Sequence, residues 1–490
     1  MTEGGRRPRI VVAGGGFAGL WAVRRLAGEP VDVVLLDTNN YHTFVPLLYQ
    51  VATADLGPAE VAYPIRSIFR GARNVEFRMA EVESLDPGRQ EVVTDVERVP
   101  YDHLLLAIGS RSNFLGIEGA GEHSFPLKEM SEAIPLRHHI FSRFERAIYE
   151  RDPERRRAQL TFTIVGGGPT GVEFAGALAE LVHGPLRKDY PTLDMGEVRI
   201  VLLEAMDRLL LGMDPKLGAY ARDRLERRGV EVRTGAFVSR VEADRVHLEN
   251  GEPVDTGTIV WSAGVQGPEG PEAWGLPVGK GGKVEVEETL QVPGHPEILV
   301  AGDLAYMEQE GEPLPAVAPV AIQQGKHAGD NLARLAQGRP AVPFRFEDPG
   351  MLAVIGRNTA VAEVAGRSFT GFVAWVLWSA IHIAKLIGFR NRAMVLIQWA
   401  WNYFSGGRDV RLILPPARPL EPWLEPHPHA SGPPPELKGR EAASGKEGGE
   451  EEEAASGEEA SSDQAPAPGR GAAPGKDAPP GGAAREEEEP

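Results

Sequence analysis

Cysteine is absent from all 490 residues of the chain. Its absence excludes disulfide bonds, thiolate-ligated metal sites, cysteine-ligated iron–sulfur clusters and redox-active dithiols. The twelve histidines are scattered, and His138 and His139 are expected on a surface helix, so we predict no metal site. Cysteine-free chains occur in oxidising and reducing compartments alike, so the absence leaves the compartment open.

A surplus of positive charge is also missing, because 52 Lys and Arg face 70 Asp and Glu and the net charge is −18. Residues 421–490 hold 17 acidic and 6 basic side chains, which places −11 in this segment and −7 in the rest. Without a basic field, the chain is not expected to bind nucleic acid. Residues 415–490 are rich in Pro, Gly, Ala, Ser and Glu. They are predicted to form a disordered acidic tail.

Long apolar runs are lacking as well. No uncharged apolar segment reaches 18 residues, so we expect no transmembrane helix. The N-terminal sequence MTEGGRRPRIVVAGGG has a short apolar run that ends in glycines. This pattern is typical of the first strand of a domain rather than of a signal peptide.

The chain does contain a repeated unit of strand, glycine turn, helix and strand. In the first copy, residues 14–19 (GGGFAG) follow an apolar strand, and the second strand ends at Asp37. The same order returns over residues 160–204, with the turn at 166–171 (GGGPTG) and Glu204 at the strand end. This repeat predicts an α/β fold with two doubly wound, Rossmann-like dinucleotide-binding domains.

The glycine turns have a specific chemical use. Their glycines permit a tight turn, close approach of a pyrophosphate, and helix–strand packing, while the helix N-terminus offers free N–H groups to phosphates. Two such sites suggest two dinucleotides, a nicotinamide and a flavin that accepts its hydride. The predicted binding residues are Gly14, Gly16, Phe17, Ala18, Gly19 and Asp37 in the first unit, and Gly166, Gly168, Pro169, Thr170, Gly171 and Glu204 in the second.

Five segments together resemble type II NADH:quinone oxidoreductases. They are residues 14–19, 40–50 (NYHTFVPLLYQ), 101–110 (YDHLLLAIGS), 166–173 (GGGPTGVE) and 298–303 (ILVAGD). The resemblance covers about residues 8–413 and implies FAD in the first domain and NADH in the second, inserted one. It implies two-electron transfer from NADH through FAD to a respiratory-chain quinone, menaquinone or ubiquinone, without proton pumping.

Further cofactor contacts follow from strands that end in small residues. The resemblance implies that Ala107, Gly109, Gly302 and Asp303 lie at the FAD, with Asp303 near the ribityl chain; Ala263 and Gly264 end a strand of the NADH domain. The alternative for Asp303 is a helix cap. The alternative for Ala107 and Gly109 is a simple strand-ending turn.

The resemblance also implies two catalytic candidates. Glu173 matches a family glutamate thought to assist proton handling on the quinone side of the flavin; the alternative is a carboxylate favoured by the helix dipole. Residues 318–323 (APVAIQ) align with the family motif A-Q-x-A-x-Q, but Pro319 replaces its first glutamine. Gln323 is therefore the remaining polar contact for a quinone, or else a buried glutamine that bonds backbone groups.

Residues 371–404 hold Trp375, Trp378, Trp399 and Trp401, half of the chain's eight tryptophans, together with three cations. Two short apolar helices joined at residues 388–392 suit a membrane interface, with rings at headgroup depth and cations towards lipid phosphates. We expect peripheral attachment to the cytoplasmic face of the cell membrane. The alternatives are a homodimer interface or an ordinary core helix pair.

The expected domains and the rival functions complete the interpretation. The domains are 8–114 and 265–340 for FAD, 115–264 for NADH, 341–414 for the C-terminal membrane-associating unit, and 415–490 for the tail. Because Pro319 weakens the quinone motif, a soluble NADH-dependent flavin oxidase or reductase with another acceptor stays open. So does a non-catalytic NADH-sensing flavoprotein, for which turnover would be slow.

Glu204 predicts a preference for NADH over NADPH. A carboxylate at this strand end accepts a hydrogen bond from a free ribose 2′-hydroxyl and repels a 2′-phosphate. Steady-state oxidation should therefore be more efficient with NADH, and comparable turnover with NADPH would contradict the assignment.

Overall fold

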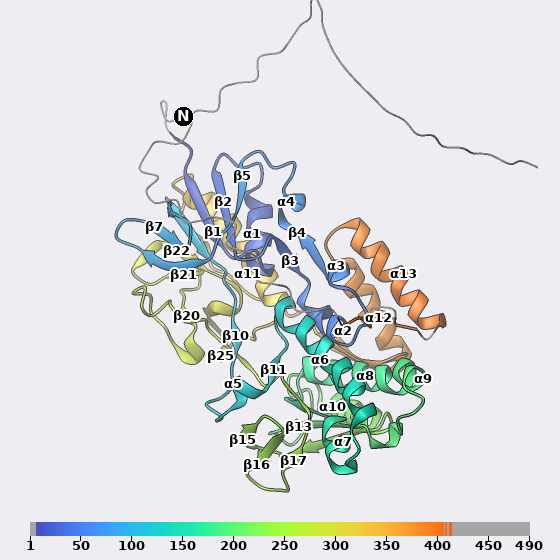
Figure 1. The fold of residues 1–490 in the computed structure, drawn as a ribbon. Coiled ribbons are helices and arrows are strands. Elements are labelled where there is room, and N and C mark those ends of the chain that lie inside the picture. The colour runs from blue at the N-terminus through green and yellow to red at the C-terminus, as the bar shows by residue number, and fades with distance from the viewer. Residues whose placement is uncertain (1–5, 406, 409–410, 414–490) are drawn as a thin grey trace, which may run out of the picture. The chain divides into compact units, whose positions relative to one another are not determined.

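The first glycine turn lies at the carboxyl edge of a six-stranded sheet with the order β21-β22-β9-β1-β2-β5 (Figure 1). All neighbours run parallel except β21. Because β22 pairs with β9, a strand from late in the chain completes a sheet begun at the N-terminus. The bounds are β1 Arg9–Ala13, β2 Asp32–Asp37, β5 Val75–Met79, β9 His103–Leu106, β21 Gln291–Val292 and β22 His295–Val300.

The second glycine turn lies at the edge of a five-stranded parallel sheet, ordered β11-β18-β12-β13-β14. The interior positions of its central strands are buried and are apolar or threonine, as expected where both faces are covered. The predicted fold of two doubly wound sheets is therefore confirmed. The bounds are β11 Phe125–Pro126, β12 Thr161–Val165, β13 Arg199–Glu204, β14 Val230–Thr234 and β18 Thr258–Trp261, with helices α6 Met130–Tyr149, α8 Pro169–Leu181 and α10 Pro215–Glu226.

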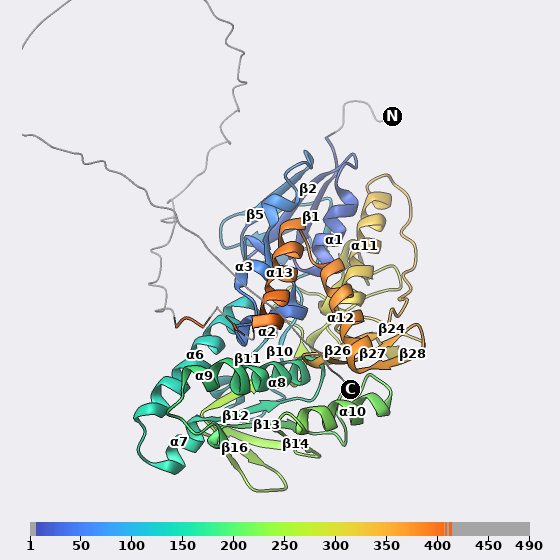
Figure 2. The ribbon, with the colours of Figure 1, turned by 90° about the vertical axis from the view of Figure 1, so that its right-hand side faces the viewer.

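The structure is a computed structural model that describes residues 6–405, 407–408 and 411–413, all within one compact unit (Figures 1 and 2). The predicted tail, 415–490, lies outside the described residues. Three-stranded antiparallel sheets flank the main ones. Their strands are β6 Val82–Asp86, β7 Glu91–Thr94 and β8 Arg98–Pro100, and β15 Val238–Glu242, β16 Arg245–Leu248 and β17 Val254–Asp255.

Helix α11 (Ala318–Leu335) packs closely against α1 (Phe17–Leu26) because glycines face that contact. A Cβ at Gly325 would lie 2.2 Å from the carbonyl oxygen of Ala18, and one at Gly329 would lie 2.7 Å from that of Ala22. Gly325 and Gly329 are four positions apart in α11, as Ala18 and Ala22 are in α1. Both contacts therefore lie on one face of each helix. This packing holds the start of α11 beside the first glycine turn.

The C-terminal unit is a three-stranded antiparallel sheet followed by two helices. Its elements are β26 Met351–Gly356, β27 Thr359–Val364, β28 Arg367–Thr370, α12 Gly371–Lys385 and α13 Phe389–Ser405. The helices join at residues 386–388, slightly before the expected joint at 388–392, because most of that segment already belongs to α13. No helix among the described residues is long and apolar enough to cross a membrane.

The orientation of the tryptophans differs from the expectation that all four rings lie at a lipid interface. Trp401 is 58% exposed, but Trp378 is only 2% exposed. Trp378 and Trp399 contact each other, with ring centres 5.4 Å apart, and their indole N–H groups donate to Glu173 and Gln50. Hydrogen bonds to the buried side chains of Glu173 and Gln50 thus orient these two rings towards the protein interior.

Because α8 closely contacts β26 at Gly176, replacing this glycine by alanine should have the opposite of its usual effect on stability. Alanine normally stabilises a helix interior relative to glycine, but a Cβ at Gly176 would lie 2.1 Å from the Ile355 carbonyl oxygen. We expect Gly176→Ala to destabilise the fold by about 1–3 kcal/mol, seen as a lower thermal midpoint. Gly184→Ala is the matched control, because a Cβ there meets no atom within 4 Å. Equal midpoints for both variants would contradict the packing argument.

Candidate functional site

The residues expected around FAD gather at one edge of the six-stranded sheet. There β1 leads into the turn at 14–19, β9 into residues 107–110, and β22 into residues 301–303, while β2 ends at Asp37. Neighbouring parallel strands bring their carboxyl ends together, and this edge is where such folds bind ligands. The sheet order therefore assembles sequence-predicted residues that lie nearly 300 positions apart.

The first turn can accept a pyrophosphate. Helix α1 has no side-chain cap, and a Cβ at Gly16 would meet no atom within 4 Å. The free N–H groups at the start of α1 therefore face open space. Asp37 accepts hydrogen bonds from the N–H groups of Gly15 at 2.6 Å and Asn39 at 2.7 Å. Two donors leave lone pairs on this carboxylate for a ribose diol. The residues present thus fit a dinucleotide.

The second turn repeats this geometry. Helix α8 also lacks a side-chain cap, and Gly168 faces open space. Glu204 accepts from the Gly167 N–H at 2.5 Å and the Met206 N–H at 2.8 Å, as Asp37 does in the first turn. Pro169 and Thr170 are exposed at the start of α8, and the strand-end residues 263–264 lie across the same edge, after β18. The structure therefore contains two cradles with the same geometry, one formed by residues 14–19 and Asp37 and the other by residues 166–171 and Glu204.

Asp303 is held by an ion pair that the sequence did not indicate. Its Oδ2 accepts from Lys128 Nζ at 2.9 Å and from Ser110 Oγ at 2.7 Å. Burial opposes ionisation, but the Lys128 charge and these hydrogen bonds together lower the pKa of Asp303. Lys128 precedes α6, so the carboxylate beside the FAD edge is fixed from a distant part of the chain.

The start of α11 holds two glutamines with different partners. Gln323 donates to the carbonyl of Glu347 at 2.7 Å and accepts from its N–H at 3.0 Å. Both ends of its amide are thus bonded to backbone, as in the alternative of a glutamine that bonds backbone groups, and one N–H and one lone pair remain unused in these bonds. The contact of Gln323 with a quinone stays a prediction. Gln324 is buried and accepts from the Gly302 N–H at 2.8 Å. Pro319 lies in the first turn of α11, where no N–H bond is lost.

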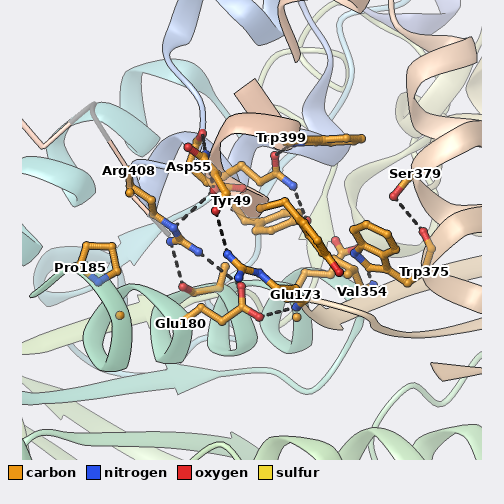
Figure 3. A pocket seen from close by; sticks show the side chains of 18 of the residues that line it. Tyr49, Asp55, Glu173, Glu180, Pro185, Val354, Trp375, Ser379, Trp399 and Arg408 are labelled. Atoms are coloured by element: carbon orange, nitrogen blue, oxygen red, sulfur yellow. Dashed lines mark hydrogen bonds and ion pairs between the residues drawn. The ribbon is translucent and has the colours of Figure 1, made fainter. Parts of the chain in front are cut away.

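Glu173 lies at a cavity of about 420 Å³ formed by α8, the C-terminal unit and α2 (Leu48–Ala52) (Figure 3). The Glu173 side chain is buried, and its Oε1 accepts from Val354 N at 3.2 Å and Trp378 Nε1 at 3.1 Å. Burial raises the pKa of Glu173 to about 8, against the effect of both hydrogen bonds. Near neutral pH, most molecules therefore carry a proton here. Gln323 does not line this cavity.

Arg408 closes the polar end of the cavity. Its guanidinium donates to the carbonyls of Thr53 at 2.9 Å and Ala177 at 3.1 Å, and it lies between Asp55 and Glu180 (Figure 3). Its side chain is only 8% exposed. A buried cation needs such compensation, and sequence reasoning could not place it. The cavity thus offers carboxylates at its polar end and the protonated Glu173 two turns nearer the start of α8.

Comparisons with known families agree with this architecture. The model of the pyridine nucleotide-disulphide oxidoreductases matches residues 8–325, and that of the NDH2 C-terminal domain matches residues 349–409. A solved structure of NDH2 from Plasmodium falciparum in complex with NADH has a TM-score of 0.76 at 18% identity. That alignment covers 84% of this chain and 100% of the other, and it shows a shared fold.

Curated relatives carry the family assignment. A type II NADH:quinone oxidoreductase of Mycobacterium tuberculosis is 37% identical over 418 residues, which are 82% of this chain and 89% of that protein. An internal alternative NAD(P)H-ubiquinone oxidoreductase of Arabidopsis thaliana is 30% identical, over 84% of this chain and 87% of that protein. With both cradles, the C-terminal unit and these matches in place, the chain belongs to the type II NADH:quinone oxidoreductases.

Proposed function

We propose that this chain oxidises NADH and passes two electrons to a membrane quinone, with Glu173 delivering the proton that completes quinone reduction. The NADH:quinone reaction is that of the family and is not coupled to proton pumping. The observation that carries the catalytic part is a buried carboxyl group whose pKa is about 8, beside a cavity that water can fill.

The two cradles divide the cofactors between them. Gly16, with the uncapped end of α1, would hold the FAD pyrophosphate, Asp37 its ribose and Asp303 its ribityl chain. Gly168 and Glu204 would hold NADH in the same way. Bound FAD would supply the two-electron redox centre between NADH and the quinone.

Proton balance defines the role of Glu173. NADH supplies a hydride, so reduction of a quinone to a quinol takes up one further proton. Glu173 sits one turn into α8, just after the NADH turn, and holds a proton at neutral pH. Glu180 lies two turns further along the same helix and lines the same cavity. We assign Glu173 the proton donor role and the cavity the route for its reprotonation.

Gln323 is assigned a positioning role. Its two hydrogen bonds to Glu347 tie α11 to the segment that leads into β26. Because Pro319 cannot bond through its side chain and Gln323 already bonds Glu347, this helix has fewer polar contacts to offer a quinone than the family motif would have. This is the observation that favours the second candidate, a flavin oxidase or reductase with another acceptor.

Membrane attachment through residues 371–404, on the cytoplasmic face, is part of the proposal. The side chains of Phe372, Val373, Leu396, Ile397 and Phe404 are between 55% and 86% exposed on α12 and α13. Apolar helix faces of this kind bury themselves at a lipid surface. A second copy of the chain is the alternative occupant of these faces.

Electron transfer is tested by following flavin absorbance without oxygen. NADH should bleach the flavin of the FAD-reconstituted protein, and a menaquinone or ubiquinone analogue should restore its colour with rapid turnover. If NADH bleaches the flavin and quinone leaves it reduced, the family fold and both cofactors stand, but the acceptor is another molecule. A slow cycle with a long-lived charge-transfer band would instead indicate a sensor.

The role of Glu173 is tested by Glu173→Gln, which keeps an oxygen to accept both hydrogen bonds but cannot release a proton. We expect the quinone-dependent kcat to fall by about 10²–10⁴-fold, while bleaching by NADH persists. The wild-type kcat should decline as pH rises through about 8, where the carboxyl group ionises, and the variant should lack this decline.

Trp378→Phe is the companion variant. The Trp378 hydrogen bond lowers the pKa of Glu173, so its removal should shift the alkaline decline of kcat to higher pH. An unchanged pH profile in both variants would remove Glu173 from the reaction and leave it a structural group.

A further inference from the structure

Two cations lie over the ring of Trp21 on α1. The guanidinium carbon of Arg24 is 4.7 Å from the centre of the Trp21 ring, and Lys326 Nζ on α11 is 4.6 Å from it. The cations therefore approach one aromatic ring from two helices that pack against each other. An aromatic ring attracts each cation.

Two more cations come from the C-terminal helices. Burial and, next, the charge of Arg392 on α13 lower the pKa of Arg24. Burial and, next, the charge of Lys326 lower the pKa of Lys385 on α12. Arg24, Lys326, Lys385 and Arg392 thus form one basic cluster, drawn from four helices that are labelled in Figure 2.

No carboxylate of the described residues pairs with this basic cluster. The acidic side chain on the neighbouring turn of α11, Asp330, is bonded to Arg25 at 2.6 Å. Helix dipoles account for Arg24 and Lys385, which lie in the last turns of α1 and α12. Arg392 in turn donates its Nε–H to the carbonyl of Leu386, at the C-terminal end of α12, at 2.7 Å. Helix dipoles do not account for Lys326 in the middle of α11.

The basic cluster borders the apolar surface of the C-terminal helices. Phe389, between Lys385 and Arg392 in sequence, is 88% exposed. Ile387, at the joint of the two helices, is buried in the same apolar cluster that Trp21 packs against. The helix joint is therefore anchored in the cluster that Trp21 also contacts, and the helices that it connects carry both exposed apolar side chains and members of the basic cluster. This juxtaposition matches the boundary between the acyl chains and the headgroups of a bilayer.

We propose that the basic cluster binds the phosphate of an anionic phospholipid while the apolar faces of α12 and α13 enter the acyl region. Guanidinium and ammonium groups donate charge-assisted hydrogen bonds to phosphate oxygens. The bound phosphate also relieves the repulsion among the four cations. This inference rests on the proposed membrane attachment and adds Arg24 and Lys326, which lie outside residues 371–404, as lipid contacts.

The test measures sedimentation of the FAD-loaded full chain with two kinds of vesicle, phosphatidylcholine alone and phosphatidylcholine with phosphatidylglycerol. The variant is Arg24→Gln with Lys326→Gln, which removes two charges and keeps similar side-chain length. Arg151→Gln with Arg157→Gln is the matched control, because these exposed cations lie at or beside α7 (Pro153–Gln159), away from α12 and α13 in Figures 1 and 2. Bound flavin and NADH oxidation with a water-soluble quinone check the fold of each variant.

We expect wild type to bind the anionic vesicles more tightly, and the Arg24/Lys326 variant to lose about 30-fold of that affinity, since each Lys or Arg at such a surface contributes about fivefold. Binding to neutral vesicles should be unchanged. Equal wild-type affinity for both vesicles, or equal losses in the variant and its control, would overturn the phosphate site and leave membrane attachment standing. Failure of wild type to bind either vesicle would overturn the attachment itself.

Discussion

The pairing of β22 with β9 is the contact on which the rest of the site depends. The chain leaves the first sheet after β9, builds the whole second sheet, and returns about 190 residues later to lie beside the strand it left. Only then do residues 301–303 reach the edge where the first glycine turn and Ser110 already lie. The same return lays α11 on α1 through Gly325 and Gly329, and it places Asp303 within reach of Lys128. A long loop closure of this kind is costly in entropy, and the buried parallel strands offset it.

Desolvation by the C-terminal unit gives Glu173 its chemistry. Glu173 lies one turn into α8, and the pKa of a glutamate carboxyl group in water is about 4.3. Here β26 and α12 cover Glu173, and burial outweighs the two hydrogen bonds that favour ionisation. The C-terminal unit, whose helices expose apolar side chains, thus also raises the pKa of Glu173 by burying it. The proposed attachment to lipid and the proposed proton transfer would therefore share one structural element, in which Trp378 is bonded to Glu173 and Trp401 is exposed.

The cations of the described residues differ in whether carboxylates pair with them. The described part of the chain is mildly acidic, and many of its arginines pair with carboxylates, as Arg25 does with Asp330. The members of the basic cluster come from four separate helices and meet only in the folded chain. Arg408 shows the opposite solution, since two carboxylates and two backbone carbonyls surround a buried cation.

The sequence by itself determined the two doubly wound domains, both cofactor cradles and the two C-terminal helices. These features are local: a glycine turn between a strand and a helix, with a carboxylate ending the next strand, carries its chemistry wherever it folds. Tertiary structure alone decided that Gln323 bonds to backbone, that Gln324 braces Gly302, and that Trp378 turns inward. It also decided the partners of Asp303 and the raised pKa of Glu173. Burial and long-range pairing set those properties, and neither is encoded in the spacing of residues along a single segment.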